Sequence, residues 1–168
     1  MDKLKVAITN MQKEIKIPTG IRLLIRKCCH AVLQLEGKTG DYEVSVSFVD
    51  NEQIEKLNSE YRNKDMPTDV LSFPSAREGE FETSRETGAV MLGDIAISVP
   101  MVYRQAEQFG HSPQREFAYL TVHSMLHLLG YDHEKGGMAT VRMREKEEDV
   151  LSRLGLRRDA SYVNDYDA

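Results

Sequence analysis

Tryptophan and cysteine are scarce in this chain, which has no Trp and only two cysteines, Cys28 and Cys29. Neighbouring residues of a helix point in different directions, so these two thiols are not expected to pair. Because the sequence also contains no C-x-x-C pattern, it predicts no thiolate metal site. We expect two free, buried thiols in a protein of the reducing cytoplasm.

Long hydrophobic runs are absent as well. No apolar stretch approaches the ~20 residues that a membrane-spanning helix needs, and the first five residues carry no apolar signal segment. We therefore expect neither a membrane protein nor an exported one. Hydrophobic residues at 40% and charged residues at 29% are ordinary for a soluble globular protein. A length of 168 residues suits one domain with a substantial core.

An excess of positive charge is missing too, since the formal net charge is −5. At first sight this argues against RNA binding, because phosphate contacts need Lys and Arg. Two segments account for the whole value, −2 from residues 77–86 and −3 from residues 159–168. Residues 1–38 hold eight Lys or Arg against three Asp or Glu. An RNA-binding surface is therefore not excluded, although such an excess is more often only a solvated face.

Three of the five histidines fall within eleven residues, at His123, His127 and His133. Residues four apart on a helix share one face, about 5–6 Å apart at Cβ, so the first two imidazoles can reach one ion. Gly130 is the residue type that ends a helix in the left-handed conformation and lets the chain turn back. A third imidazole just after that turn can complete a face of three nitrogens.

This arrangement predicts a catalytic rather than a structural metal site. Three protein ligands leave the fourth tetrahedral position of zinc open for water, and three imidazoles suit zinc better than other common ions. We therefore expect one Zn²⁺ per chain, held by His123, His127 and His133, in a metal-dependent hydrolase.

One well-known hydrolase mechanism does not match the spacing. Metzincin proteases carry H-E-x-x-H-x-x-G-x-x-H, in which the Glu after the first His is the general base. Ser124 stands at that position here, and a hydroxyl without an activating partner cannot replace the carboxylate. A metzincin-like metalloprotease is thus the less favoured alternative.

The periodicity of apolar residues predicts an α+β protein without internal repeats. Four strands are expected, at residues 5–9, 41–49, 70–73 and 90–97. Five helices are expected, at residues 20–34, 51–61, 99–109, 113 to the turn at Gly130, and 138–154. Residues 75–87 are polar and acidic, and we expect a loop there. The domain is expected to span residues 1–156, followed by a frayed acidic tail at 157–168.

Three sequence blocks, in order, resemble the bacterial YbeY family of metal-dependent endoribonucleases. They are residues 58–74 (NSEYRNKDMPTDVLSFP), residues 92–98 (LGDIAIS) and the histidine block itself. In that family, the residue at the position of Ser124 typically has a small side chain. The resemblance covers roughly residues 44–156. It implies a single α+β domain with a small mixed sheet covered by helices, and a metal site at the end of one long helix.

The resemblance also implies a function. It predicts a zinc-dependent endoribonuclease, selective for single strands, that acts in 16S 3′-end maturation and ribosome quality control in the cytoplasm. RNA and the small ribosomal subunit with its proteins would be its partners. A non-enzymatic ribosome-assembly protein with a structural zinc remains an alternative. The sequence does not indicate an oligomeric state.

Two further side chains are candidates for this site. Cleavage of an anionic phosphodiester calls for a cation near the metal, and guanidinium matches phosphate oxygens in a bidentate way. Arg62 occupies the position of the family's motif arginine and is the predicted catalytic cation, unless it only pairs with Asp65 or Asp69 to pin its loop. Asp94 is a candidate to orient a histidine, although a cap or a salt bridge is an equally good role for it.

Acidic neighbours of the third histidine are weaker candidates. Asp132 and Glu134 flank His133 and could act as a base or orient a ligand. We expect both of them to face solvent instead.

Overall fold

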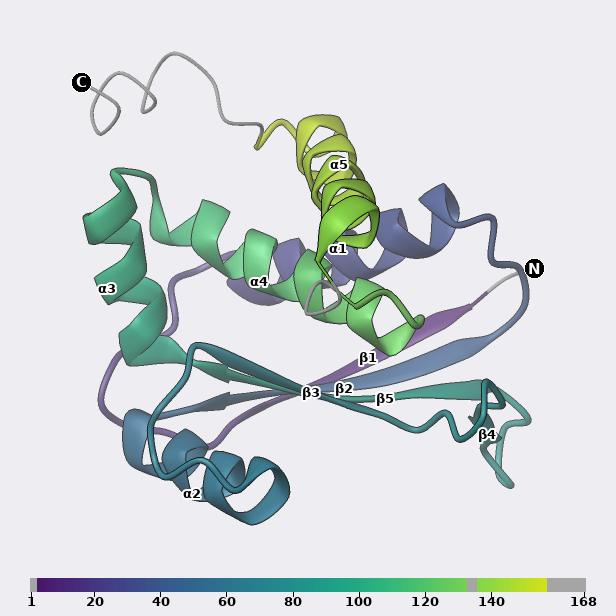
Figure 1. Ribbon diagram of the computed structural model, residues 1–168, viewed down its shortest axis with the longest axis horizontal. Helices are drawn as coiled ribbons and strands as arrows, with labels where there is room; N and C mark the ends of the chain where they lie inside the picture. Colours follow the sequence, from purple (N-terminus) through teal and green to yellow (C-terminus); the bar gives the residue numbers. More distant parts are fainter. Residues whose placement is uncertain (1–2, 133–135, 157–168) are drawn as a thin grey trace.

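One mixed sheet of five strands organises the computed structural model, which describes residues 3–132 and 136–156 (Figure 1). The strands are β1 (Leu4–Asn10), β2 (Tyr42–Val49), β3 (Val70–Pro74), β4 (Glu82–Thr83) and β5 (Val90–Ser98). The order is β1-β2-β5-β3, with β1, β2 and β5 parallel and β3 antiparallel to β5. Strand β3 therefore forms one edge of the sheet.

The four predicted strands are confirmed, whereas β4 was missed. This two-residue strand pairs with β5 inside the segment predicted as a loop at 75–87. A strand of two residues is too short to show an alternating pattern, so its pairing partner rather than its own sequence defines it.

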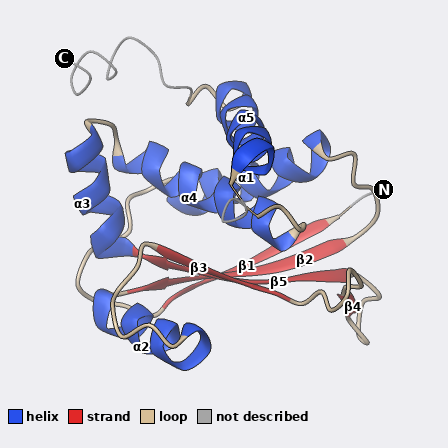
Figure 2. Ribbon diagram, viewed as in Figure 1, coloured by secondary structure: helices blue, strands red, loops and turns tan. Residues whose placement is uncertain are grey.

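Five helices are present in the same described residues, as predicted. They are α1 (Ile21–Leu35), α2 (Asn51–Arg62), α3 (Val99–Phe109), α4 (Pro113–Leu128) and α5 (Gly137–Arg153). Helices α1 and α4 cover one face of the sheet, α5 packs on the outer side of these two helices, and α2 lies against the other face of the sheet (Figures 1 and 2). None of these helices is both long enough and apolar enough to cross a membrane.

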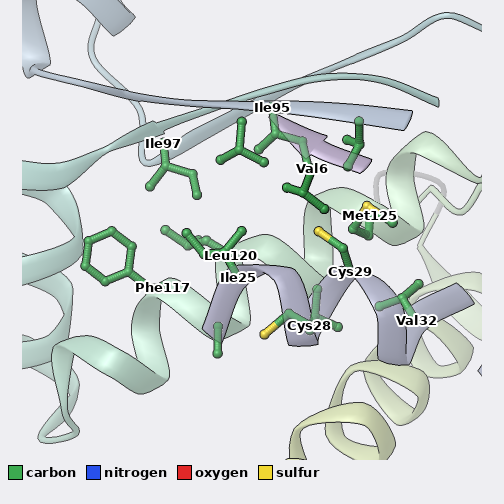
Figure 3. Close-up of a cluster of buried hydrophobic side chains, with 14 of the residues drawn as sticks. Val6, Ile25, Cys28, Cys29, Val32, Ile95, Ile97, Phe117, Leu120 and Met125 are labelled. Carbon is green, nitrogen blue, oxygen red and sulfur yellow. The ribbon is translucent and has the colours of Figure 1, made fainter. Parts of the chain in front are cut away.

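The main core lies between the sheet and helices α1 and α4, as Figure 3 shows, and extends to the side chains of α5 that pack on these helices. Ile95 and Ile97 of β5 face Leu120 and Met125 of α4, and all four are buried. The two cysteines lie on α1 in this core and are free, as predicted. Burial raises the pKa of the Cys28 thiol to about 12, so it is not a nucleophile at neutral pH.

Local sequence signals fix both ends of α4. Ser112 caps its first turn by accepting a hydrogen bond from the Arg115 amide, and Pro113 occupies the first helical position. At the other end Gly130 adopts φ +106°. Its N–H bonds the His127 carbonyl at 3.0 Å, and the Tyr131 N–H bonds the Leu126 carbonyl at 3.0 Å. This pair of bonds is a Schellman motif, which turns the chain back beside the histidines.

Candidate active site

A cleft of about 620 Å³ opens between the edge strand β3 and the C-terminal half of α4. The end of α2 and the turn after α4 complete its walls. The residues that line the cleft are Arg62, Thr68, Asp69, Val70, Leu71, Ser72, Tyr119, Leu120, His123, His127, Gly130, Tyr131 and Asp132. The cleft thus brings His123 and His127 together with Arg62 of the block 58–74.

The two predicted helical ligands lie side by side in this cleft. The ring centroids of His123 and His127 are 4.8 Å apart, with an interplanar angle of 73°. Both side chains are half-buried. His133 lies outside the described residues, and within residues 3–132 and 136–156 no three ligating side chains gather into a metal site. The structure therefore supplies two imidazoles of the predicted three.

A carboxylate from α5 holds the first of these histidines. His123 Nδ1 lies 2.5 Å from Glu147 Oε2, and the Glu147 side chain is only 5% exposed. An ionised carboxylate only accepts hydrogen bonds, so Nδ1 is the donor here, and in a neutral ring the lone pair is then on Nε2. This arrangement is typical of metal-binding histidines, whose second nitrogen donates to a carboxylate.

Sequence reasoning missed Glu147, although a signal for it existed. On the predicted helix at 138–154, Glu147 falls four residues after Met143 and four before Leu151, both of which are buried. A carboxylate on the apolar stripe of a helix needs a partner, because burying a charge without one is costly. The position of Glu147 on this stripe indicated that its carboxylate has a partner, but not which residue that partner is.

Tyr119 forms another wall around His123. The two rings are stacked, with centroids 5.8 Å apart and an interplanar angle of 29°. Burial, together with the negative charges of Glu147, Glu116 and Asp69, raises the pKa of Tyr119 to about 12. Tyr119 therefore stays a protonated phenol at neutral pH.

Arg62 is the last residue of α2 and lines the same cleft. A capping box, in which Asp50 and Gln53 exchange hydrogen bonds of 2.8 and 2.9 Å, fixes the start of that helix. Asp69, one of the expected partners of Arg62, accepts a 2.7 Å bond from the Val70 amide. It thereby shapes the backbone that leads into β3.

The structure places Asp94 away from the histidines. Asp94 is on β5, is exposed, and lines two grooves on the α2 side of the sheet. It is not among the described residues that line the cleft. Its alternation along β5 explains this, because Ile95 faces the main core and its neighbour must point the other way. Asp132 does line the cleft, and Glu134 lies outside the described residues.

Ser124, at the position of the metzincin glutamate, is fully buried in α4. It is not one of the described residues of the cleft.

The turn after α4 is tied to two other helices. The Tyr131 hydroxyl donates to Glu36 Oε1 at 2.6 Å, and Lys146 Nζ donates to Glu36 Oε2 at 2.7 Å. Lys146 also lies over the Tyr131 ring, 5.3 Å from its centroid. Burial acts to raise the pKa of Glu36, but these two bonds and the Lys146 charge outweigh it and lower that pKa.

Comparisons with known proteins agree on one family. Residues 7–155 match the family model described as Endoribonuclease YbeY. A protein of that name from Caldanaerobacter subterraneus subsp. tengcongensis is 49% identical over 160 residues, covering 92% of this chain and 100% of the relative. Another from Desulforamulus reducens is 46% identical over 155 residues, with 92% and 100% coverage. The solution structure of a Thermotoga maritima protein matches with a TM-score of 0.57 and 25% identity, over 93% of this chain and 97% of that one.

Proposed function

This chain belongs to the YbeY endoribonuclease family, and from that membership and the cleft we propose that it is a zinc-dependent endoribonuclease acting on single-stranded RNA. The observation that carries the proposal is the meeting of His123, His127 and Arg62 in one cleft. Two imidazoles offer a site for a metal, and the guanidinium offers a partner for the phosphate.

The residues present fit a zinc ion. His123 would bind through Nε2, because Glu147 engages Nδ1. His127 would supply a second nitrogen and His133 a third, for one ion per chain. When bound, zinc lowers the pKa of a water ligand to about 7, which provides a nucleophile or base at neutral pH.

Side chains of the cleft would then bind the substrate and orient the groups that act on it. Arg62 would hold the scissile phosphate and stabilise the charge that develops on it. Tyr119, a phenol at neutral pH, can donate a hydrogen bond within the cleft. Glu147 would keep the His123 ring in one tautomer and one orientation.

The biological setting follows from the family. We propose that the substrate is ribosomal RNA near the 16S 3′ end, that the protein acts on the small ribosomal subunit in the cytoplasm, and that it serves ribosome quality control. The family name supports the endoribonuclease activity, and the resemblance of the sequence motifs supports the remainder.

The test is cleavage of a fluorescently labelled single-stranded RNA and of its duplex by the zinc-loaded, the chelated and the zinc-restored protein. We expect cleavage of the single strand only, lost on chelation and regained with zinc. His127→Ala should retain its fold but bind far less than one zinc per chain at micromolar concentration, measured by elemental analysis. Full activity of the chelated protein would remove the metal from the proposal. A structural zinc would instead leave the loaded protein inactive on every RNA.

A further inference from the structure

Tyr61 is an aromatic residue that the proposed chemistry does not use. It immediately precedes Arg62 in the last turn of α2, and its side chain is 65% exposed. Its ring meets Phe73 of β3 edge to face, with centroids 5.2 Å apart and an interplanar angle of 64°. An edge contact leaves one face of the Tyr61 ring open, so this tyrosine is held in place without being covered.

The open ring borders a second groove of about 570 Å³ on the α2 side of the sheet. Apolar side chains contribute much of its walls: Met11, Val49, Leu57, Phe73 and Ala96. Met11 at the rim is 55% exposed. Polar groups are contributed by Ser47, Gln53, Lys56, Glu60 and Asp94. The groove is large enough for a flat aromatic ligand and has hydrogen-bonding groups around it.

This groove lies across the edge strand β3 from the proposed active-site cleft, and residues adjacent in sequence line the two. Residues 70–72 of the edge strand line the cleft, and the next residue, Phe73, lines the groove. In the same way Arg62 belongs to the cleft and Tyr61 to the groove. A ligand that leaves the cleft over β3 and the end of α2 therefore reaches Tyr61 next.

We infer that the groove binds an unpaired nucleobase of the RNA, adjacent to the phosphate held at Arg62. The inference rests on the proposed function. Bases stack on exposed aromatic rings whatever their sequence, because every base has a π-face. Glu60 and Asp94 repel phosphates but accept hydrogen bonds from the N–H groups of a base, so the groove suits a base rather than the backbone. Bases in a duplex are already stacked and paired, and cannot enter. The groove thus gives a physical reason for single-strand selectivity.

The experiment measures binding of a labelled single-stranded RNA by fluorescence anisotropy, together with KM and kcat, for zinc-loaded variants. Tyr61→Ala should weaken RNA binding and raise KM about tenfold, the loss expected for one stacked base. Tyr61→Phe should behave as the unchanged protein. Tyr61→Leu keeps an apolar side chain without the ring and should resemble Tyr61→Ala. Phe109→Ala, which truncates another exposed aromatic side chain, is the matched control. It should change neither RNA binding nor KM and kcat.

Each outcome of this experiment either supports or rejects the stacking of a base on Tyr61. Melting temperatures equal to that of the unchanged protein would show that all four variants fold, as the exposure of Tyr61 leads us to expect. If Tyr61→Ala then binds and cleaves the single strand normally, no base stacks there, and an apolar protein segment is the better occupant of the groove. If the unchanged protein binds no RNA at all, the proposed function fails as well.

Discussion

Glu147 of α5 and His123 of α4 form a partly buried carboxylate–imidazole pair, with 2.5 Å between Oε2 and Nδ1. The two residues are 24 positions apart in the sequence, so the pair depends on how α5 packs against α4. It engages one ring nitrogen of His123 and leaves the other for the proposed zinc ion. The position of α5 is for this reason part of the proposed zinc site.

Glu147→Gln should weaken zinc binding about 10- to 100-fold, the usual effect of losing such an outer carboxylate. The amide keeps the size of the side chain but no longer fixes the protonated nitrogen. Competition with a chromophoric chelator measures the affinity directly. Glu145→Gln, an exposed position on the same helix, should bind zinc normally. Equal affinities for the two variants would show that Glu147 only packs.

Arg62→Ala should lower cleavage of single-stranded RNA by about 10²–10³, as expected when one donor to a developing anion is lost. Zinc content and melting temperature should not change. Arg62→Lys should restore little activity, because an ammonium cannot form the bidentate fork. The cleavage rate, the zinc content and the melting temperature are measured on one preparation of each variant. A lower melting temperature with activity kept in the folded fraction would assign Arg62 a structural role instead.

Gly93→Ala should destabilise the fold at the junction of β5 and β3. Gly93 has φ +139°, and a Cβ there would lie 2.2 Å from the Phe73 carbonyl oxygen. The backbone conformation alone costs about 1–3 kcal/mol for other residues, and the clash adds to it. Gly88→Ala is the control, because its φ is also positive, +76°, but nothing lies within 4 Å of the added Cβ. Urea unfolding should show a clearly larger loss for Gly93→Ala.

Glu36→Gln should lower stability at neutral pH by about 1.5–3 kcal/mol, the range for hydrogen bonds to charged groups. Folding lowers the pKa of Glu36 from its usual 4.5. The contribution of this carboxylate is therefore complete above pH 4.5 and is lost as the pH falls through the lower, folded value. Urea melts of both proteins across this range should converge at acid pH. A difference that stays constant down to pH 2 would exclude the ionised carboxylate as its cause.

Local patterns were enough to predict most of the fold. The alternation in β2, the cap at Ser112 and the turn at Gly130 each depend on nearby residues only, and each is confirmed. Strand β4 was missed because its two residues are defined by pairing with β5.

Local spacing could predict the site only where its residues are close in sequence, and Arg62 was predicted from the family resemblance instead. His123 and His127 share a helix face, so their spacing reveals them. The contact between Glu147 and His123 depends on the packing of two helices, which no local pattern describes. Asp94 sits in a family-like block, but the face of a strand on which a residue lies is set by its register, and here it faces the α2 side.

The hydrogen bonds of Glu36 to Tyr131 and Lys146 also affect local unfolding of the protein. Tyr131 and Glu36 are 95 residues apart in the sequence, so this contact ties the rim of the cleft to a helix from the first quarter of the chain. Local unfolding usually begins in segments that make few buried contacts with the rest of the protein. The rim after α4 is anchored to both α1 and α5, and should exchange its amide hydrogens with those helices as one cooperative unit. We therefore expect this wall of the cleft to keep its shape until α1 and α5 themselves open.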